Sequence, residues 1–400
     1  MALGAATGAY WGEPAAERVG WLGTLFIRLL RMVVVPLVIC SIVSGVASVG
    51  ASGGVGRLFG KTFGYYLLSS LCAVLVGLAA VNVIRPGVGA DLGAAATKEL
   101  PPDLRTATSV PDLLLDIVPH NVVDAAARSD MLAVIFFTLL FGLAAGTLPD
   151  EHRRPLVGFF EAAFQAMMKL TGWVIALAPL GVFGLMTRAV ASFGLGAFQP
   201  MAWYMGTILV GLLVHFVIVL PLLLRLLGGI HPLIHLRNMS EALVLAFSTS
   251  SSAATLPVTL RAVEQRVGVS NRITSFVLPM GATVNMDGTA LYECAGVLFI
   301  AQALGIDLSL GQQAVVVLTA VLASIGAAAV PSAGLVIIFI VLEAVGLRGP
   351  QVEVIVGLML AVDRPLDMLR TSVNVYSDSC GAAIIARSEG EDQVDAEFRK

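Results

Sequence analysis

The stretch LIHLRNMSEALVLAFSTSSSAATLPVTLRAVEQRVG, residues 233–268, decides the fold. It holds two apolar arms of about a dozen residues each around the polar run Ser248–Ser252. A dozen helical residues rise only about 18 Å, so neither arm can cross a bilayer core of about 30 Å. Irregular backbone at membrane depth is tolerated only where protein or a water-filled cavity satisfies its polar groups. The stretch therefore predicts a re-entrant helical hairpin in a membrane protein.

The same pattern recurs at 311–347, where the tip reads ASIGAAAVPSAG (323–334). Each hairpin is followed by a helix of unusual polarity, at 272–301 and at 352–387. A hairpin and a polar helix, occurring twice, are typical of a transporter built from inverted repeats.

The composition supports a membrane protein. Of the 400 residues, 57% are apolar and 13% are charged, about half the charge of a soluble domain. This excludes a soluble enzyme, a disordered chain and a secreted disulfide scaffold, and no basic run indicates nucleic acid. The four cysteines have no paired spacing, so we expect buried apolar side chains rather than disulfides or metal ligands.

Further apolar segments complete an all-α, polytopic protein of about eight transmembrane helices plus the two hairpins. Residues 1–11 are too short to span, so either a first helix begins upstream of Met1 or it is shortened here. The other segments lie at 22–48, 58–84, 131–148, 157–192 and 200–228. Basic residues at the ends of these segments place the 49–57 turn, the 149–156 turn and the C-terminal tail, 389–400, in the cytoplasm. The expected location is the cell membrane.

The helix at 352–387 carries a polar stripe inside a membrane segment. At 100° per residue the stripe falls within an arc of about 100°. Charges in hydrocarbon cost a few kcal/mol each, so the stripe is expected to face an interior site. A buried ion-pair network that only joins helices is the alternative. The members of the stripe are Asp363, Asp367, Arg370, Thr371, Asn374 and Asp378.

The preceding segment, GATVNMDGTALYE (281–293), predicts a break in its helix. Asn285, Asp287 and Gly288 are poor helix formers, and a local break frees backbone carbonyls. Carbonyl and carboxylate oxygens together suit a small hard cation. A kink without any ligand is the alternative.

Four motifs in this order resemble the dicarboxylate/amino acid:cation symporter family, which includes the glutamate transporters. They are STSSSAATLP (248–257), NMDGT (285–289), ASIGAAAVP (323–331) and LDMLRTSVNV (366–375). The resemblance extends over almost the whole chain, including LFIRLLRMVVVPLV (25–38) and YYLLSS (65–70).

The resemblance implies a homotrimer in which a mobile transport domain slides across the bilayer like an elevator against a static scaffold. The scaffold would comprise 1–57 and 87–193. The transport domain would comprise 58–86 and 194–388, including both hairpins.

The resemblance also implies a substrate site for L-aspartate or L-glutamate. Asp367 would bind the α-amino group, and Arg370 would bind the side-chain carboxylate, which a guanidinium can grip through two hydrogen bonds. The remaining contacts would come from Thr289, Thr371, Asn374, Ser251, Ser252 and the Val330 backbone.

Sodium ions are the coupling ions that the resemblance implies, at three sites. The first would use Gly281, Asn285, Asn374 and Asp378. The second would use Tyr66, Ser69, Ser70, Asn285 and Asp287. The third would use carbonyls of Thr283, Ser324, Ile325 and Ala327. Glu293 stands where animal members have a proton-carrying glutamate, so it is the expected proton carrier.

Alternatives stay open at this stage. A C4-dicarboxylate carrier would keep Arg370 without needing Asp367, and a neutral amino acid carrier would be expected to lose Arg370. A gated ion channel is the alternative from another class. An intramembrane enzyme would need a positioned nucleophile and base, and the sequence offers no such pair.

Overall fold

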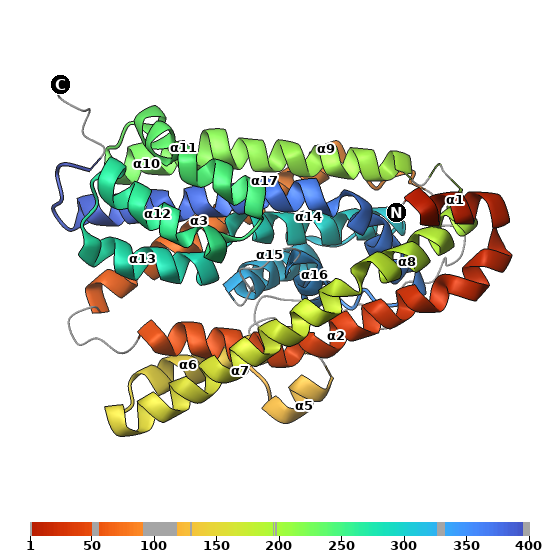
Figure 1. The fold of residues 1–400 in the computed structure, drawn as a ribbon, viewed down its shortest axis with the longest axis horizontal. Coiled ribbons are helices and arrows are strands. Elements are labelled where there is room, and N and C mark those ends of the chain that lie inside the picture. Colours follow the sequence, from red (N-terminus) through yellow and green to blue (C-terminus); the bar gives the residue numbers. More distant parts are fainter. Residues whose placement is uncertain are drawn as a thin grey trace.

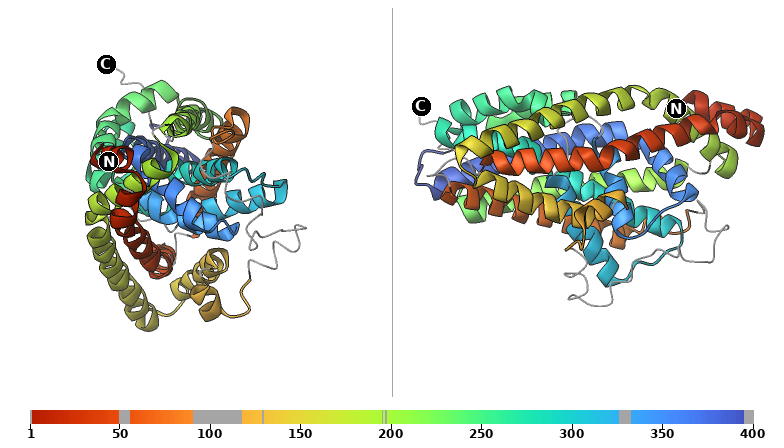
Figure 2. Two further views of the ribbon diagram at one scale, coloured as in Figure 1. Left: turned by 90° about the vertical axis from the view of Figure 1, so that its right-hand side faces the viewer. Right: turned by 90° about the horizontal axis from the view of Figure 1, so that it is seen from below.

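The computed structural model describes residues 2–49, 56–90, 118–128, 130–194, 196, 198–325 and 333–394. These residues form helices and contain no strand, which confirms the all-α prediction. The helices form an elongated bundle along one long axis (Figures 1 and 2). In chain order they are α1 (Ala2–Trp11), α2 (Glu13–Val49), α3 (Gly56–Ile84), α5 (Val122–Ala127), α6 (Met131–Gly146), α7 (Asp150–Ala176), α8 (Ala178–Phe193), α9 (Phe198–Val214), the π-helical turn η2 (His215–Val219), α10 (Leu220–Gly228), α11 (Pro232–Thr249), α12 (Ser252–Ala262), the π-helical turn η3 (Val263–Val267), α13 (Asn271–Val284), α14 (Asp287–Ala303), α15 (Leu310–Ile325), α16 (Ala333–Ala344) and α17 (Pro350–Ser388).

Within the described residues, three helical stretches are long and apolar enough to cross a membrane. They are Glu13–Ala47, Arg57–Ile84 and Phe198–Gly228. A fourth span results if α7 and α8, which meet at a bend of 48°, are taken together. Several remaining helices are short or broken, and the total of about eight spans stays a prediction.

Two sets of helices pack chiefly among themselves. The helix α2 lies against α6, α7 and α8, and α1 lies against α8. The helix α17 lies against α11, α13 and α14, while α3 packs on α14 and α9. In Figure 1, α2, α6 and α7 lie below α17, α14 and α9, and α1 lies at the right-hand end of the bundle. They meet where α17 touches α8 and where α16 touches α2 and α6.

The first predicted hairpin is a pair of helices joined by a tight turn. Helix α11 ends at Thr249. The next residue, Ser250, has a φ of 52° that reverses the chain, and α12 packs back on α11. Ser251 caps α12, because its Oγ accepts a hydrogen bond from the Ala254 N–H at 3.2 Å. The first arm has 18 residues, longer than the predicted dozen, because its helix begins at Pro232 and runs through the polar residues before the apolar segment.

The second predicted hairpin consists of α15 and α16, which pack against each other. Its tip, residues 326–332, lies outside the described residues. The membrane depth of both hairpins stays a prediction.

The two segments predicted to be polar helices, 272–301 and 352–387, differ in their continuity. The predicted break in 272–301 is confirmed, because α13 ends at Val284, α14 begins at Asp287, and Asn285 has an extended φ of −106°. In contrast, 352–387 lies within one continuous helix of 39 residues, α17. Its polar stripe is buried along its whole length, as predicted.

The end of α17 is joined to α3 by an ionic cluster at one end of the bundle. Glu389 follows α17 and accepts hydrogen bonds at 2.6 Å from both Lys61 and Arg57 of α3. Arg272, at the start of α13, is a third cation, 3.7 Å away. Hydrogen bonds from Lys61 and Arg57 hold the pKa of Glu389 below its usual range. The cluster therefore joins the ends of three helices of the second set.

Candidate functional site

The centre of the polar stripe is an arginine enclosed by two carboxylates. Arg370 is 1% exposed, and its Nη2 donates to Asp367 Oδ1 at 2.8 Å and to Asp363 Oδ1 at 3.1 Å. A second cation, Arg364, lies 3.6 Å from Asp367 Oδ2, but its side chain is 53% exposed. Among the deeply buried side chains of this group, the two acids Asp363 and Asp367 outnumber the single base, Arg370.

Arg370 keeps unused donors. Its Nε and Nη1 are buried and have no hydrogen-bond partner among the described residues. The guanidinium lies over the Tyr292 ring of α14, with its carbon 3.8 Å from the ring centroid. Gly334 of α16 comes so close that a Cβ there would be 2.7 Å from Arg370 Nη1. A buried donor without a partner is costly, so these donors are available to an anion such as a carboxylate.

The break between α13 and α14 brings more predicted substrate contacts to α17. Asn374 Oδ1 accepts from the Gly288 N–H at 2.8 Å, and Asn374 Nδ2 lies 3.3 Å from Thr289 Oγ1. Thr371 is also buried, although its hydroxyl donates to the Asp367 carbonyl of its own helix. The arrangement therefore groups Asp367, Arg370, Thr371, Asn374 and Thr289 around the α13–α14 break.

The remaining predicted substrate residues belong to the two hairpins. Ser251 and Ser252 lie at the turn between α11 and α12, and both helices contact α17. The Ser372 hydroxyl of α17 donates to the Leu243 carbonyl of α11 at 3.1 Å, which fixes this hairpin on the polar helix. Val330 and Ala327 lie outside the described residues.

Glu293 lies one residue beyond Tyr292 on α14. It is fully buried, and neither carboxyl oxygen has a hydrogen-bond partner in the described part of the chain. An ionised carboxylate in that state would be strongly disfavoured, because burial without donors removes its hydration. The position therefore suits a group that carries a proton.

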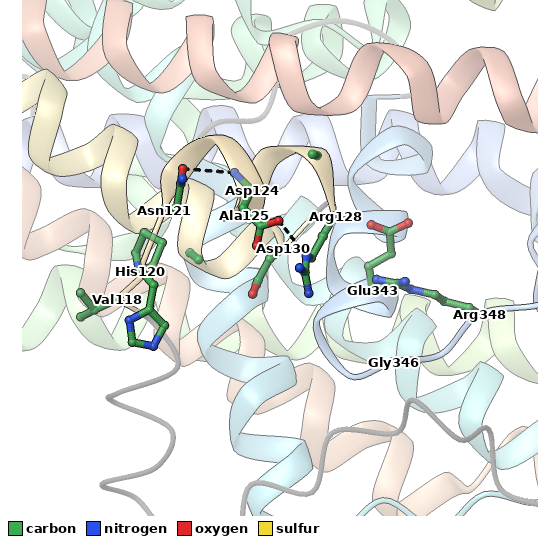
Figure 3. A pocket seen from close by; sticks show the side chains of 13 residues that line it. Val118, His120, Asn121, Asp124, Ala125, Arg128, Asp130, Glu343, Gly346 and Arg348 are labelled. Carbon is green, nitrogen blue, oxygen red and sulfur yellow. Dashed lines mark hydrogen bonds and ion pairs between the residues drawn. The ribbon is translucent and has the colours of Figure 1, made fainter.

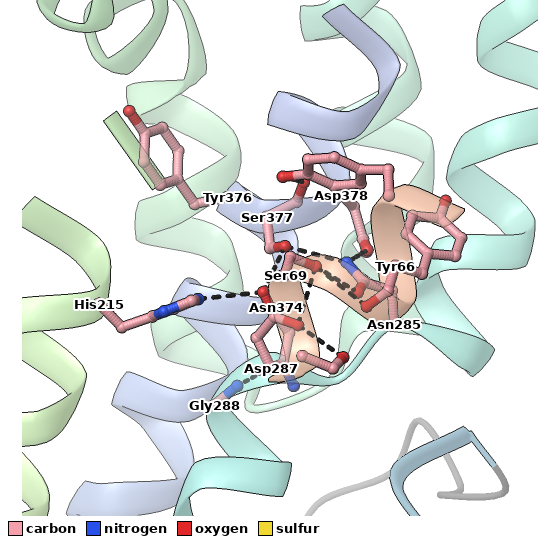
Figure 4. A network of polar contacts seen from close by, with 12 residues as sticks. Tyr66, Ser69, His215, Asn285, Asp287, Gly288, Asn374, Tyr376, Ser377 and Asp378 are labelled. Carbon is pink, nitrogen blue, oxygen red and sulfur yellow. Dashed lines mark hydrogen bonds and ion pairs between the residues drawn. The ribbon is translucent and has the colours of Figure 1, made fainter. Parts of the chain in front are cut away.

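A second cluster, drawn in Figure 4, is built around Asp287 at the first position of α14. Asp287 Oδ1 accepts from Ser70 at 2.8 Å and lies 3.2 Å from the Ser69 hydroxyl. Asp287 Oδ2 accepts from Ser377 at 2.6 Å and lies 3.0 Å from His215 Nε2. Helices α3, α14 and α17 and the turn η2 thus converge on one fully buried carboxylate.

A short chain of hydrogen bonds joins Asp287 to Asp378. Asn285, in the helix break, donates to Asp378 Oδ1 at 2.9 Å and to Ser377 Oγ at 3.0 Å. Gly281 lies against the same acid: a Cβ at this position would be 2.5 Å from Asp378 Oδ1 and 2.7 Å from the Tyr66 hydroxyl. The structure therefore brings together Asp287, Asn285, Asp378 and the predicted α3 residues, Tyr66, Ser69 and Ser70.

The third predicted ion site is assembled only in part. Thr283 is near the end of α13, Ser324 and Ile325 end α15, and these two helices are in contact. The hydroxyls of Thr283 and Ser324 donate to carbonyls of their own helices, at 3.1 and 2.8 Å.

Two members of the Asp287 cluster were missed by the sequence reasoning. His215 and Ser377 are both fully buried. The available signal for His215 was a single titratable residue inside an apolar span, a pattern that marks functional positions in membranes. Ser377 gave no signal, since small polar residues are common in packed membrane helices.

A separate cavity of about 720 Å³ lies between α5, the start of α6 and the segment that follows α16 (Figure 3). Charged residues from both sides line it, including Asp124, Arg128, Glu343 and Arg348. None of its lining residues belongs to the predicted substrate or ion sites.

Buried ion pairs, broken helices and apolar spans define a class of protein, a polytopic membrane transporter. The chain matches the model of the sodium:dicarboxylate symporter family over residues 1–388. It is 36% identical to the proton/glutamate-aspartate symporter of Escherichia coli, covering 97% of this chain and 91% of that protein. It is 34% identical to the proton/sodium-glutamate symport protein of Bacillus subtilis, covering 98% and 91%. It is 35% identical to human excitatory amino acid transporter 3, covering 91% and 78%.

The chain therefore belongs to the sodium:dicarboxylate symporter family, which confirms the resemblance seen in the motifs. It is a multi-pass plasma-membrane protein of a transporter family rather than an enzyme family.

Proposed function

We propose that this protein is a secondary active symporter that couples uptake of L-aspartate or L-glutamate to sodium. The observation that carries the proposal is the buried Arg370, which has two unused donors beside the acids Asp363 and Asp367. The arginine can bind a carboxylate group of a substrate, and a neighbouring aspartate can bind an amino group. Together they match a substrate that has both an amino group and a second carboxylate.

In this proposal Asp367 binds the α-amino group, and the guanidinium of Arg370 binds the side-chain carboxylate. Thr289, Thr371 and Asn374 supply further hydrogen bonds, and the hairpin residues Ser251, Ser252 and Val330 close over the substrate. The buried position of the α17 residues supports this, because hydrogen bonds to charged groups are strongest where water is excluded.

Sodium fits the second cluster. Every predicted ligand there offers oxygen. Ser377 donates to Asp287 and accepts from the Asn285 amide nitrogen, which also donates to Asp378. The absence of a side chain at Gly281 lets the Asp378 carboxylate and the Tyr66 hydroxyl lie close to α13. Bound sodium supplies positive charge that offsets the buried acids.

The transport cycle we propose is an elevator movement within a homotrimer. The set of helices around α2 would form the scaffold, and the set around α17 would move with the substrate. The separate packing of the two sets supports this division at 1–57 and 87–193 against 58–86 and 194–388.

Sodium coupling has a direct test. Uptake of labelled aspartate into proteoliposomes is expected to fall to the level of protein-free liposomes when the sodium gradient is replaced by choline. Uptake that continues without sodium, driven equally well by a proton gradient, would contradict sodium coupling.

Proton coupling is the second candidate, and one observation favours it. Glu293 is buried and receives no hydrogen bond from the described residues, and two relatives have names that include proton symport. We propose that Glu293 takes up a proton during the cycle, with or without sodium.

Glu293→Gln is expected to flatten the dependence of aspartate uptake on external pH between 5 and 9, because glutamine mimics the protonated acid at every pH. The matched control is Glu241→Gln, a glutamate whose side chain is 43% exposed and paired with Arg261 and Arg266. It should keep the wild-type profile. If Glu293→Gln transports with the wild-type pH profile, Glu293 is a structural residue.

Competition with labelled aspartate distinguishes between the possible substrate classes. Excess unlabelled glutamate should suppress aspartate uptake. Strong suppression by succinate would indicate a C4-dicarboxylate carrier, and strong suppression by alanine would indicate a neutral amino acid carrier. Currents without substrate accumulation would indicate a channel.

A further inference from the structure

His215 lies against the Asp287 cluster although no motif pointed to it. Its side chain is fully buried, and its Nε2 is 3.0 Å from Asp287 Oδ2, a contact visible in Figure 4. Burial removes the hydration of both groups, so the hydrogen bond between them must compensate for that loss. The contact therefore calls for an explanation in terms of the site.

The local sequence explains how His215 reaches the cluster. Helix α9 buries one face, which includes Tyr204, Ile208 and Leu212. The helix then widens into the π-helical turn η2, immediately before Pro221, which cannot donate to the carbonyl four residues earlier. Such turns are frequent at functional sites.

The widened turn directs two consecutive side chains into the bundle. His215 meets Asp287, and Phe216 packs on Tyr376 of α17, with ring centroids 4.7 Å apart. Tyr376 precedes Ser377, the other donor to Asp287 Oδ2. His215 is therefore fixed by packing on the same part of α17 that supports the carboxylate.

The proposed function takes Asp287 as an ionised sodium ligand. An ionised carboxylate can only accept hydrogen bonds, so in that state the proton of this contact is on His215 Nε2. Oδ2 then receives donors from His215 and Ser377, while Oδ1 faces Ser69 and Ser70 of α3. The two oxygens of Asp287 therefore differ in their surroundings. Oδ2 is held by hydrogen bonds from His215 and Ser377, and Oδ1 faces the proposed ion ligands of α3.

We propose that His215 is a positioning residue for the sodium site, which holds Asp287 Oδ2 so that Oδ1 is aimed at the ion. It is not itself a ligand, since its Nε2 is occupied by the hydrogen bond and sodium prefers oxygen. The inference rests on the proposed function, because it takes Asp287 as a sodium ligand. It assigns to α9 and η2 a part in ion binding that the motifs did not indicate.

The test uses three variants of His215 and measures sodium binding without substrate. The purified protein is titrated with NaCl at constant ionic strength in choline chloride, and the sodium-induced rise in unfolding temperature gives a half-saturating concentration. Aspartate uptake against sodium concentration is the second readout. His215→Leu removes the donor but keeps bulk. His215→Gln has an Nε2–H donor the same number of bonds from Cα, and His215→Asn has a donor one bond too short.

His215→Leu and His215→Asn are expected to raise the half-saturating sodium concentration by about tenfold or more, as is typical when a partner of a metal ligand is lost. His215→Gln should recover most of this loss. Maximal uptake at saturating sodium should change little in all three, because the ligands themselves are intact. His235→Leu is the matched control, since His235 is equally buried but contacts Ser379 Oγ at 3.0 Å instead of Asp287. It should leave the sodium titration near wild type.

Two results would overturn the role of His215. One is a folded His215→Leu or His215→Asn protein whose sodium titration matches wild type. The other is a His215→Gln protein as weak as the leucine variant, which would show that imidazole packing matters rather than the donor. If wild-type protein shows no response to sodium at all, the proposed sodium coupling has failed instead, so the two failures can be told apart.

Discussion

Arg370→Ala is expected to abolish binding of aspartate and glutamate. The change removes the only buried cation described in the α17 stripe, together with the two donors that have no other partner. Truncating one member of a buried charged pair at a binding surface costs about 2–5 kcal/mol, which corresponds to roughly a 30-fold to 5,000-fold loss of affinity. We expect the upper part of this range, because a carboxylate left in the empty site would face Asp363 and Asp367.

The measurement is binding of labelled aspartate at saturating sodium. Arg370→Lys keeps the charge but loses the planar fork, so we expect intermediate affinity. Arg364→Ala is the contrasting variant. Its side chain is half exposed, and such pairs contribute no more than about 1 kcal/mol, so its loss should be about fivefold or less.

Folding must be separated from binding, because Arg370→Ala leaves two buried acids without their cation. The sodium-induced rise in unfolding temperature serves this purpose, since the proposed ion ligands do not include Arg370. A variant that still responds to sodium but not to aspartate has lost the substrate site alone. Wild-type aspartate affinity in Arg370→Ala would contradict the assignment.

The sequence predicted the parts of the fold that depend on composition and local pattern. Long apolar spans, the reversal at Ser250 and the break at Asn285 follow from local residue chemistry, and all three are present. The predicted length of the first hairpin arm was wrong, because helix ends depend on capping and tertiary contacts more than on hydropathy.

The candidate site was predictable where residues of one helix share a face. The polar stripe on α17 could be predicted from the helical period alone, and its members are buried as that prediction requires. Contacts between distant segments could not be derived in this way. Ser70 and Asp287 are joined at 2.8 Å, and this pair came from the resemblance, whereas the contact between His215 and Asp287 depends on a π-helical turn that no periodicity announces.

Gly281→Ala is expected to produce the second largest effect, on sodium rather than on the substrate. The new Cβ would be 2.5 Å from Asp378 Oδ1 and 2.7 Å from the Tyr66 hydroxyl, so one of these groups must move. Both are predicted ion ligands, in the first and second sites respectively. Overpacking of a well-filled interior costs about 1–3 kcal/mol, which would raise the half-saturating sodium concentration roughly 5-fold to 150-fold if the strain is relieved at the ion site.

Gly206→Ala makes the same chemical change inside α9 at a position with no neighbouring atom within 4 Å. Alanine is favoured over glycine in a helix by about 1 kcal/mol, so this control should unfold at the same or a higher temperature and keep its sodium dependence. Both variants are compared by sodium titration of aspartate uptake and by unfolding in choline chloride.

Comparing Gly281→Ala with Gly206→Ala shows whether steric contact of the new Cβ or a change in helix propensity causes the effect. Gly281→Ala gains helix propensity just as Gly206→Ala does, so propensity alone would stabilise both proteins. A loss confined to Gly281→Ala can therefore come only from the contact of its Cβ with Asp378 and Tyr66. If Gly281→Ala binds sodium as tightly as wild type, the Asp378 carboxylate can move without cost, and its proposed role as an ion ligand held against α13 is wrong.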